Sequence, residues 1–524
     1  SLLFLTLHCR MDFMPLHQRI LIYNFLIFKK LNKQLNIMDK KSLFEYAWIL
    51  KIIKLLMIVV IFIPNAFSQG KISKNKKAII NSIEEKKEKL IEISDNIWEA
   101  AETSLEEFKS SKYLSDYAEQ NGFSVERGVA GMPTAFVARY GSGRPVIGIM
   151  GEFDANAGIS QKKQPTKETL LEGAAGHGCG HNLFGTASLG AAITIKELIQ
   201  KGEISGTIVY YGTPAEETIF GKVWMVREGL FDDLDICMDW HPGAEIEAST
   251  QSSKALVDFR VKFFGNASHA SADPWNGNSA VDAMELYTTG LNYYREHIRP
   301  TARIHYDIEK AGDVVNVVPE YAQIWTRLRE NDRKNVDFLY ERAKKIAEAA
   351  SMMANVRHEI SLISGIYEIQ PNRTGAGILQ KNLELLGDIS YSDYEMEYAN
   401  TILNESGKEL LGLDGKVKPL KQTMPAQGGS TDVGDVSQVV PVISLGVTTA
   451  AKGGPWHSWA VVACTGMSIG HKCLIYASKA LGMTMLDLYN NPKMIEDVKK
   501  EFLERKGDKV YDPRIPPGPP KLID

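Results

Sequence analysis

The chain has 524 residues and a formal net charge of −4 at pH 7. Its 44% hydrophobic and 24% charged residues are ordinary for a globular protein, and its length is too great for one compact core, so we expect two or more domains. The near-neutral charge argues against a basic nucleic-acid-binding surface and against an acidic solvating tail.

The first part of the chain has the pattern of an export signal. Lys51 and Lys54 precede an unbroken apolar run at residues 55–63, and the small residues Ala66 and Ser68 follow. A basic start, a short apolar run and small residues at the expected cleavage position are typical of a signal peptide. The run is short for a membrane span, and an uncleaved membrane anchor is the alternative.

We therefore interpret residues 38–68 as a signal peptide, and residues 1–37 as upstream read-through because Met38 is a plausible start. The mature protein is then exported to the periplasm or outside the cell, without a stable membrane span. Export permits disulfides, but the cysteines are widely scattered and we expect no disulfide framework. The five cysteines are Cys9, Cys179, Cys237, Cys464 and Cys473.

Apolar periodicity beyond residue 69 predicts an α/β protein with a mainly parallel sheet. Helical spacing begins at residues 76–121. Continuous apolar runs predict strands that are buried on both faces, at residues 145–150, 207–212, 235–239 and 441–448. Further helical patterns cover residues 183–200, 376–386, 394–411 and, as one long helix, 464–489.

Residues 254–366 have a different rhythm, with strands and helices in the order β-α-β-β-α-β. This order predicts a split-βαβ, ferredoxin-like α+β fold. Because the block interrupts the parallel sheet, we interpret it as an inserted lid or dimerisation domain. The expected organisation is a catalytic domain in two parts at residues 69–253 and 367–505, the inserted domain at 254–366, and a proline-rich tail at 506–524.

Each predicted parallel strand runs out into acidic or metal-binding residues at its carboxyl end. These residues are Asp154, Glu216, Glu217, His241 and His457. In an open α/β sheet, ligands bind outside the carboxyl ends of the strands. The sequence therefore predicts one polar site at this edge. Of the adjacent pair Glu216 and Glu217, one can bind a metal while the other faces the substrate as general base.

The central stretch of this edge reads His177-Gly178-Cys179-Gly180-His181-Asn182. The glycines allow a tight turn around the thiol, and thiolate and imidazole are preferred zinc ligands. The alternative is a nucleophilic Cys179 with His181 or His177 as base, which leaves the nearby acids without a role. The sequence lacks a Gly-x-Ser-x-Gly elbow, a phosphate loop and a dinucleotide fingerprint, which argues against serine hydrolases and nucleotide-dependent enzymes.

Taken together, the motifs over about residues 76–505 resemble those of the co-catalytic metallopeptidases, the family of aminoacylases, indole-acetyl-amino-acid hydrolases and glutamate carboxypeptidases. They occur in the same order as in that family. They are Gly151-Glu-Phe-Asp154, His177-Gly-Cys-Gly-His181-Asn, Pro214-Ala-Glu-Glu217, His241-Pro, Gly265-Asn-Ala-Ser-His269-Ala, Asn316-Val-Val-Pro319, Gly429-Ser-Thr-Asp432 and Pro455-Trp-His457.

The resemblance implies a role for each matching residue. Cys179 is the expected bridging ligand between two divalent ions, zinc or manganese, and the other expected ligands are His181, Glu217, His241 and His457. Glu216 is the expected general base, and Asp154 is the acid that orients a ligand. The expected substrate-binding residues are His269, which reaches the site of a neighbouring subunit, and Asn316, Arg327, Gly429 and Ser430.

Two positions depart from the family pattern. Many relatives have His-x-Asp where this chain has Glu152-Phe153-Asp154, and Asn182 replaces a common aspartate. Both departures fit the branch that acts on aminobenzoyl-glutamate, and they leave the number of bound metals open.

The resemblance implies a metal-dependent amidohydrolase that cleaves N-acyl or aroyl amino acids such as p-aminobenzoyl-glutamate, using metal-activated water with Glu216 as base. The alternatives are a dipeptidase or carboxypeptidase with the same machinery, and a non-catalytic partner subunit. We expect a homodimer, or a heterodimer with a related chain, and no nucleic-acid partner.

Overall fold

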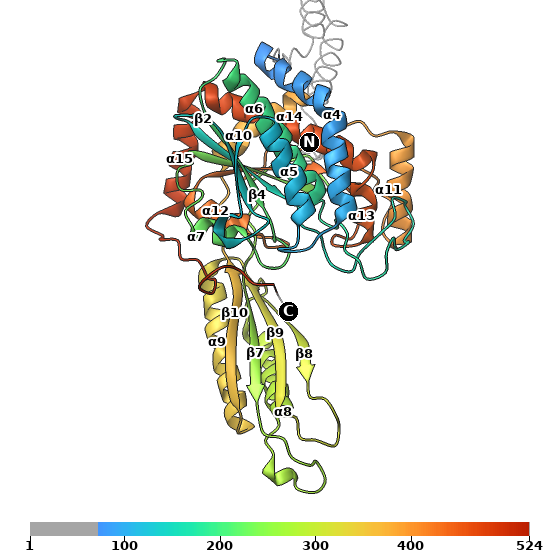
Figure 1. Ribbon diagram of the computed structural model, residues 1–524, viewed down its shortest axis with the longest axis vertical. Coiled ribbons are helices and arrows are strands. Elements are labelled where there is room, and N and C mark those ends of the chain that lie inside the picture. The colour runs from blue at the N-terminus through green and yellow to red at the C-terminus, as the bar shows by residue number, and fades with distance from the viewer. Residues whose placement is uncertain (1–71, 523–524) are drawn as a thin grey trace, which may run out of the picture. The chain divides into compact units, whose positions relative to one another are not determined.

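The computed structural model describes residues 72–522 (Figure 1). The predicted read-through segment, the predicted signal peptide and Cys9 lie outside the described residues. The cysteines at 179, 237, 464 and 473 are all buried and unbridged.

A seven-stranded sheet forms the centre of the catalytic domain, with the strand order β1-β2-β4-β3-β5-β11-β6. The four strands β4, β3, β5 and β11 run parallel, whereas β1, β2 and β6 join antiparallel at the two sides. The prediction of a mainly parallel sheet is confirmed. The strands are β1 (Ser124–Arg127), β2 (Phe136–Ser142), β3 (Val146–Glu152), β4 (Gly206–Thr213), β5 (Ile236–Gly243), β6 (Glu247–Ser249) and β11 (Val442–Thr448).

Both faces of this sheet are covered, which explains the continuous apolar runs of its parallel strands. On β4, Ile208 and Tyr210 belong to the core under one layer of helices, while Val209 and Tyr211 belong to the core on the other face. The first layer contains α4 (Lys74–Ala100), α5 (Phe108–Gln120), α6 (His181–Gln200), α10 (Arg373–Leu386) and α14 (Ser468–Asn490). The second contains α7 (Lys222–Arg227) and α12 (Val433–Val439).

Two predicted helices end or break where glycine intervenes. The single helix predicted at residues 464–489 is wrong at its start, because α13 (Trp459–Thr465) and α14 meet at a 67° bend. Gly466 lies at this bend, and a Cβ atom there would lie 2.7 Å from the Trp98 ring. Helix α11 (Asp393–Glu405) also stops before residue 411, and Gly407 follows it with φ of +63°.

Within residues 72–522, no single helix is both long and apolar enough to cross a membrane. The bent pair α13 and α14 passes this test by length and composition when the two are taken together. Most residues of α14 are buried in the core of the catalytic domain.

The inserted domain is built from β7, α8, β8, β9, α9 and β10 (Figure 1). Its four strands form a separate antiparallel sheet in the order β10-β7-β9-β8, and the two helices pack against it around a core of their own. The predicted split-βαβ arrangement is confirmed. Its elements are β7 (Ala255–Phe264), α8 (Ala280–Tyr294), β8 (Arg303–Ala311), β9 (Tyr321–Glu330), α9 (Arg333–Met353) and β10 (Arg357–Ile366).

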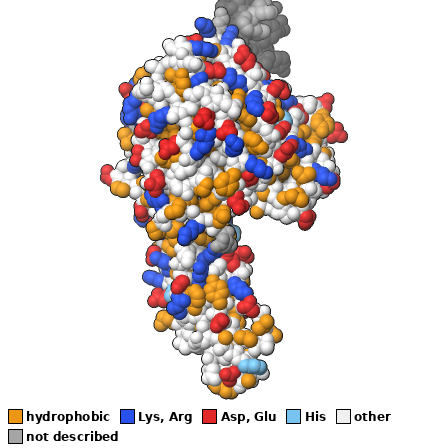
Figure 2. Space-filling view, viewed as in Figure 1, with side chains coloured by type: hydrophobic (Ala, Val, Ile, Leu, Met, Phe, Trp, Pro, Cys, Tyr) orange, Lys and Arg blue, Asp and Glu red, His pale blue; other side chains and the backbone are white. Residues whose placement is uncertain are grey.

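The C-terminal tail, residues 508–522, follows α15 (Pro492–Lys506) without helix and contacts both domains. On the catalytic domain, the Trp224 indole N–H donates to the carbonyl of Gly518 at 3.1 Å. On the inserted domain, Arg514 forms an ion pair with Asp337 of α9 at 2.8 Å. Basic and acidic side chains are interspersed over the visible face of the described residues, as the near-neutral charge suggests (Figure 2).

Candidate metal centre and active site

The carboxyl ends of the parallel strands open into a cavity of about 1040 Å³. Asp154 follows β3, Glu216 and Glu217 follow β4, His241 lies on β5, and His457 follows β11. The cavity lies at the junction with the inserted domain, which contributes residues of β9 to its wall. Its lining includes Cys179, Glu216, Glu217, His241, His457, Trp325, Arg327, Arg329, Gly429 and Ser430.

Two glycines let the central loop approach its neighbours. Gly178 accepts a hydrogen bond from the backbone N–H of His457 at 3.1 Å, and a Cβ atom at Gly178 would lie 3.2 Å from the Cα of His457. Gly180 has φ of +78° directly before α6, a conformation that glycine adopts without strain. The loop thus brings the thiol of Cys179, the first turn of α6 and the His457 loop together.

Two groups of ligand atoms share Cys179. Cys179, His181 and His241 form one group, and Cys179, Glu217 and His457 form the other, with the ligand atoms of each group within 4.8 Å of one another. The Cys179 sulfur lies 3.5 Å from Nε2 of His241, and Nε2 of His457 lies 3.7 Å from the Glu217 carboxylate. A sulfur that belongs to both groups can lie between two ions.

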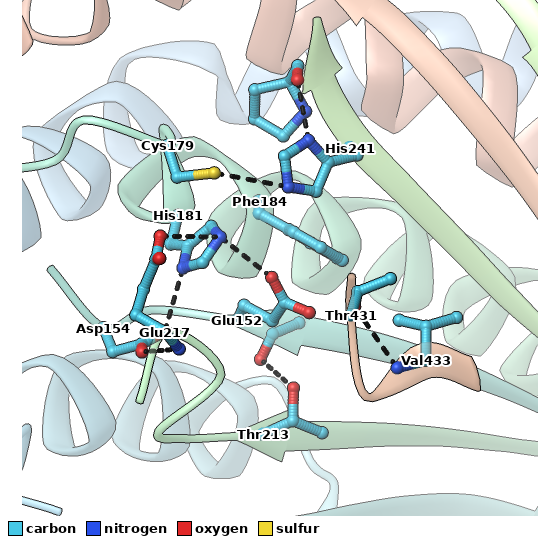
Figure 3. Close-up of polar contacts among 12 residues, drawn as sticks. Glu152, Asp154, Cys179, His181, Phe184, Thr213, Glu217, His241, Thr431 and Val433 are labelled. Carbon is cyan, nitrogen blue, oxygen red and sulfur yellow. Dashed lines mark hydrogen bonds and ion pairs between the residues drawn. The ribbon is translucent and has the colours of Figure 1, made fainter. Parts of the chain in front are cut away.

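His181 is at the centre of the buried contacts (Figure 3). Its Nδ1 lies 2.9 Å from Asp154, and its Nε2 lies 3.0 Å from Glu152 and 3.9 Å from Glu217. Burial would lower the pKa of His181, but the Glu152 carboxylate, with Cys179 and Asp154, outweighs burial and raises this pKa well above its usual value. The surroundings of His181 therefore favour a positive charge.

The residues present fit divalent metal ions. Within residues 72–522, Nε2 of His181, Oε1 of Glu217 and Oε2 of Glu152 are buried and have no hydrogen-bond partner, although the three atoms lie near one another. Buried charged atoms without partners are costly, and an ion between them would supply the missing interactions. Thiolate, imidazole and carboxylate together are a ligand set that zinc accepts.

The contacts of His241 orient its imidazole so that Nε2 can bind a metal as a neutral ligand. Its Nδ1–H donates to the carbonyl of Pro242 at 2.7 Å, which leaves the lone pair of Nε2 directed at Cys179. Burial lowers the pKa of His241 to about 4, even though the nearby Glu152 carboxylate acts to raise it. A hydrogen bond on the far nitrogen is the usual way in which a metal-binding histidine is oriented.

Cys179 is poorly suited to be a nucleophile by itself. Burial, with the Glu217 carboxylate, raises the pKa of its thiol, whereas reactive cysteines have a lowered pKa. Its place in two groups of ligand atoms therefore favours the ligand interpretation of Cys179 over the alternative of a thiol nucleophile.

Glu216 lies beside the ligand groups, in a strained turn. It is buried, and burial together with the carboxylates of Glu152 and Glu217 raises its pKa well above the usual value for glutamate. The preceding Ala215 has φ of +62°, and its N–H donates to the buried Glu107 carboxylate at 2.9 Å. Glu107 thus holds the turn that presents Glu216 to the cavity.

The predicted substrate-binding residues divide into two sets. Arg327, Gly429 and Ser430 line the cavity. His269 and Asn316 do not line it: both are exposed, in loops at the ends of strands β7 and β8 of the inserted domain, where the N–H of Ala270 donates to the carbonyl of Asn316. Asn316, expected to bind the substrate, therefore lies outside the cavity of its own chain.

Within residues 72–522, an ion pair with Asp258 balances the charge of the Arg327 guanidinium, whereas the Arg329 guanidinium has no such partner. Arg327 Nε lies 2.9 Å from both oxygens of the buried Asp258, which also accepts the indole N–H of Trp325 at 3.1 Å. Among residues 72–522, no acidic side chain forms an ion pair with Arg329, and its Nε is buried without a hydrogen-bond partner. The Oγ of Ser430, also in the lining, has no partner in this part of the chain either.

Sequence reasoning missed three residues that shape the site, namely Glu107, Lys222 and Arg329. Glu107 and Lys222 contact residues far away in the sequence, and Lys222 resembles an ordinary basic residue of a short helix. Arg329 could have been found, because it follows Arg327 on a strand whose alternate residues face the same side.

Fold and site together define a metal-dependent hydrolase, and comparisons with known proteins agree. A peptidase dimerisation domain matches residues 251–352. The chain is 36% identical to one subunit of the p-aminobenzoyl-glutamate hydrolase of Escherichia coli over 467 residues, which cover 84% of this chain and 97% of that subunit. Another subunit of the same enzyme is 26% identical over 277 residues, which cover 50% of this chain and 63% of that subunit.

Two further comparisons concern a peptidase sequence and a peptidase structure. The chain is 28% identical to a mouse Xaa-Arg dipeptidase, over 84% of this chain and 94% of the dipeptidase. A solved Bacillus subtilis structure, described as a dinuclear metal-binding peptidase of the M20 family, has a TM-score of 0.52 and 16% identity, and the match covers 78% of this chain and 99% of that structure. At this identity the match shows the fold. The chain belongs to the M20 family of metal-dependent hydrolases and peptidases.

Proposed function

We propose that this hydrolase cleaves the amide bond that joins an acyl or aroyl group to an amino acid with a free carboxylate, with p-aminobenzoyl-glutamate as the representative substrate. One observation carries the proposal: two ligand groups that share Cys179 lie beside Glu216 in a cavity that Arg329 also lines. The similarity to a subunit of p-aminobenzoyl-glutamate hydrolase supports the choice of substrate.

In this proposal the ions would be held by the two groups of ligands that share Cys179, namely His181 and His241 in one group and Glu217 and His457 in the other. The thiolate favours zinc, and the carboxylates also tolerate manganese. When bound, the ions would polarise the amide carbonyl and lower the pKa of the attacking water towards neutrality.

The chain's own residues supply positioning and proton transfer. Glu216 takes a proton from the attacking water and passes it to the leaving nitrogen. Burial and the neighbouring carboxylates make it a stronger base than an exposed glutamate. Asp154 accepts the Nδ1–H of His181 and keeps the opposite nitrogen directed at the ligand groups.

Recognition of the amino acid end involves Arg329 and the loop of Gly429 and Ser430. Within the described residues, the Arg329 guanidinium has no carboxylate partner and the Ser430 hydroxyl has no hydrogen-bond partner, so both suit a substrate carboxylate. Arg327 acts through Asp258, which holds it and Trp325 against the same wall.

His269 and Asn316 belong to a contact between subunits in this proposal. Both are exposed at the ends of strands of the domain that matches a peptidase dimerisation domain, outside the cavity of their own chain. His269 would enter the site of a partner and stabilise the oxyanion there. The partner is a second copy or a related chain, and the two different subunits of the Escherichia coli enzyme support the second possibility. Export by the predicted signal peptide remains part of the proposal.

The test is a substrate panel measured with metal analysis. The purified chain should release glutamate from p-aminobenzoyl-glutamate, and a chelator should abolish this activity until zinc or manganese is restored. Higher kcat/KM on dipeptides ending in arginine would favour the dipeptidase alternative, for which the mouse relative provides the reason. Bound metal without turnover of any amide would favour a non-catalytic partner subunit.

A further inference from the structure

A buried lysine lies behind the ligand groups and bridges two carboxylates. Nζ of Lys222 donates to Oε1 of Glu152 at 2.6 Å and to Asp432 at 2.7 Å, and the Lys222 backbone N–H donates to Asp432 at 2.8 Å. All three side chains are almost completely inaccessible to solvent. The arrangement fixes the orientation of Glu152, because Asp432 anchors the ammonium group that holds one of its oxygens.

The second oxygen of Glu152 has no such partner among the described residues. Oε2 lies 3.0 Å from Nε2 of His181, an ion pair when the imidazole is protonated, but within the described residues neither atom has a hydrogen-bond partner. Two ligands that are each about 2.1 Å from one ion lie roughly 3.0–3.4 Å apart, so this separation fits two atoms bound to the same cation. Glu152, His181 and Glu216 also form a third group whose ligand atoms lie within 4.8 Å of one another.

We propose that Glu152 is a further metal ligand, which binds through Oε2 to the ion held by His181. Lys222 and Asp432 hold the carboxylate in place and balance its charge, so that one oxygen contacts the protein and the other contacts the ion. The inference rests on the proposed metal-dependent function but concerns the metal centre alone.

The first experiment measures metal binding without substrate, so that its outcome is independent of which amide is cleaved. Zinc content after dialysis and zinc affinity by competition with a chromophoric chelator are compared for the wild-type chain and Glu152→Gln. The variant keeps the size of the side chain and an acceptor for Lys222. We expect at least a tenfold loss of affinity for one of the bound ions, in line with the roughly 10- to 100-fold losses seen when groups around a metal are changed.

Asp239→Asn is the matched control. Asp239 is a buried carboxylate on the neighbouring strand β5 with one unpartnered oxygen, and it belongs to none of the three ligand groups found in the described residues. Zinc content and affinity of Asp239→Asn should equal those of the wild type. Unchanged zinc binding in a folded Glu152→Gln variant would overturn the proposal.

A second measurement needs no variant and therefore stands even if Glu152→Gln does not fold. In a crystal structure of the wild-type protein with zinc, anomalous scattering locates each ion. The proposal expects Oε2 of Glu152 at about 2.0–2.2 Å from the ion on His181. A carboxylate that stays outside coordination distance of every ion overturns it, and shows instead that Lys222, Glu152 and Asp432 only stabilise the fold.

Discussion

The sulfur of Cys179 lies 3.5 Å from Nε2 of His241, although 62 positions of sequence separate the two residues. This proximity depends on the parallel strands, because Cys179 precedes α6 and His241 lies near the end of β5, whose carboxyl end meets that of β3 at one edge of the sheet. Cys179 belongs to two ligand groups, and His241 belongs to the one that also contains His181.

The first prediction separates the ligand role of Cys179 from a nucleophilic role. Cys179→Ser should bind less metal and lose activity in parallel, because a hydroxyl is a poorer zinc ligand than a thiolate. Cys237→Ser is the control, since Cys237 is also buried and unbridged but belongs to no ligand group of the described residues. Metal content and kcat are the measurements. Full metal occupancy with no activity in Cys179→Ser would point to a nucleophilic thiol.

The second prediction concerns Glu216. Glu216→Gln should retain its metal but lose roughly 10²–10⁴-fold in kcat, because the variant cannot accept the proton of water. Glu217→Gln should behave differently and lose metal, since its carboxylate belongs to one of the two ligand groups that share the Cys179 sulfur, whereas the group that contains Glu216 lacks this sulfur. Activity of Glu216→Gln near the wild-type level would contradict the proposed role.

The third prediction compares Arg329 with Arg327. Arg329→Met should lower kcat/KM about 10- to 100-fold on substrates with a free α-carboxylate, the range of one charge-assisted hydrogen bond. Substrates with an α-amide should be affected much less. Equal losses on the two substrate types would remove Arg329 from carboxylate binding.

Arg327→Met should instead lower the melting temperature, because it leaves the buried Asp258 without its cation, a loss of about 3–5 kcal/mol. Thermal unfolding of both arginine variants, followed by circular dichroism, makes the comparison. A normal melting temperature for Arg327→Met would show that the ion pair with Asp258 is not needed for stability.

The fourth prediction concerns pH and Glu107. Burial, followed by the charge of Asp154, raises the pKa of Glu107 from 4.5 to about 8. Between these two pH values the folded protein holds a proton that the unfolded chain releases, so this group's contribution to stability falls as the pH rises. The fall is on the order of 1.4 kcal/mol for each pH unit within that window.

Glu107→Gln removes this titration while keeping an acceptor for the N–H of Ala215 and a partner for Thr134. The variant should be more stable than the wild type at pH 8 and close to it near pH 5, as measured by urea unfolding at a series of pH values. A stability difference that does not change with pH would contradict the assignment.

The sequence predicted the sheet and most of the ligand groups because both depend on local patterns. Apolar runs marked β3, β4, β5 and β11, and the residues after each run marked the edge where His241 and His457 meet Cys179. The residues that it missed depend on distant partners. Lys222 pairs with Asp432, 210 positions away, and Glu107 reaches Ala215, 108 positions away.

The errors in the predicted helix bounds occur at glycines whose packing partners the sequence pattern does not reveal. At the break, Gly466 lies so close to the ring of Trp98, from α4 at the other end of the described chain, that a side chain there would collide with it. In the same way, the sequence contains nothing that distinguishes Arg327 from Arg329, because the partner of Arg327 is Asp258, which lies directly opposite it on the neighbouring strand β7.

The C-terminal tail connects the inserted domain to the catalytic domain at a third point, in addition to the two chain connections. The chain enters that domain before β7 and leaves it after β10, and the ion pair of Arg514 with Asp337 adds a third, non-covalent attachment whose other end is fixed at Trp224. Leu522, further along the same segment, borders the cavity. A swing of the inserted domain that widened the cavity would therefore have to break the ion pair of Arg514 with Asp337 or the hydrogen bond between Trp224 and Gly518.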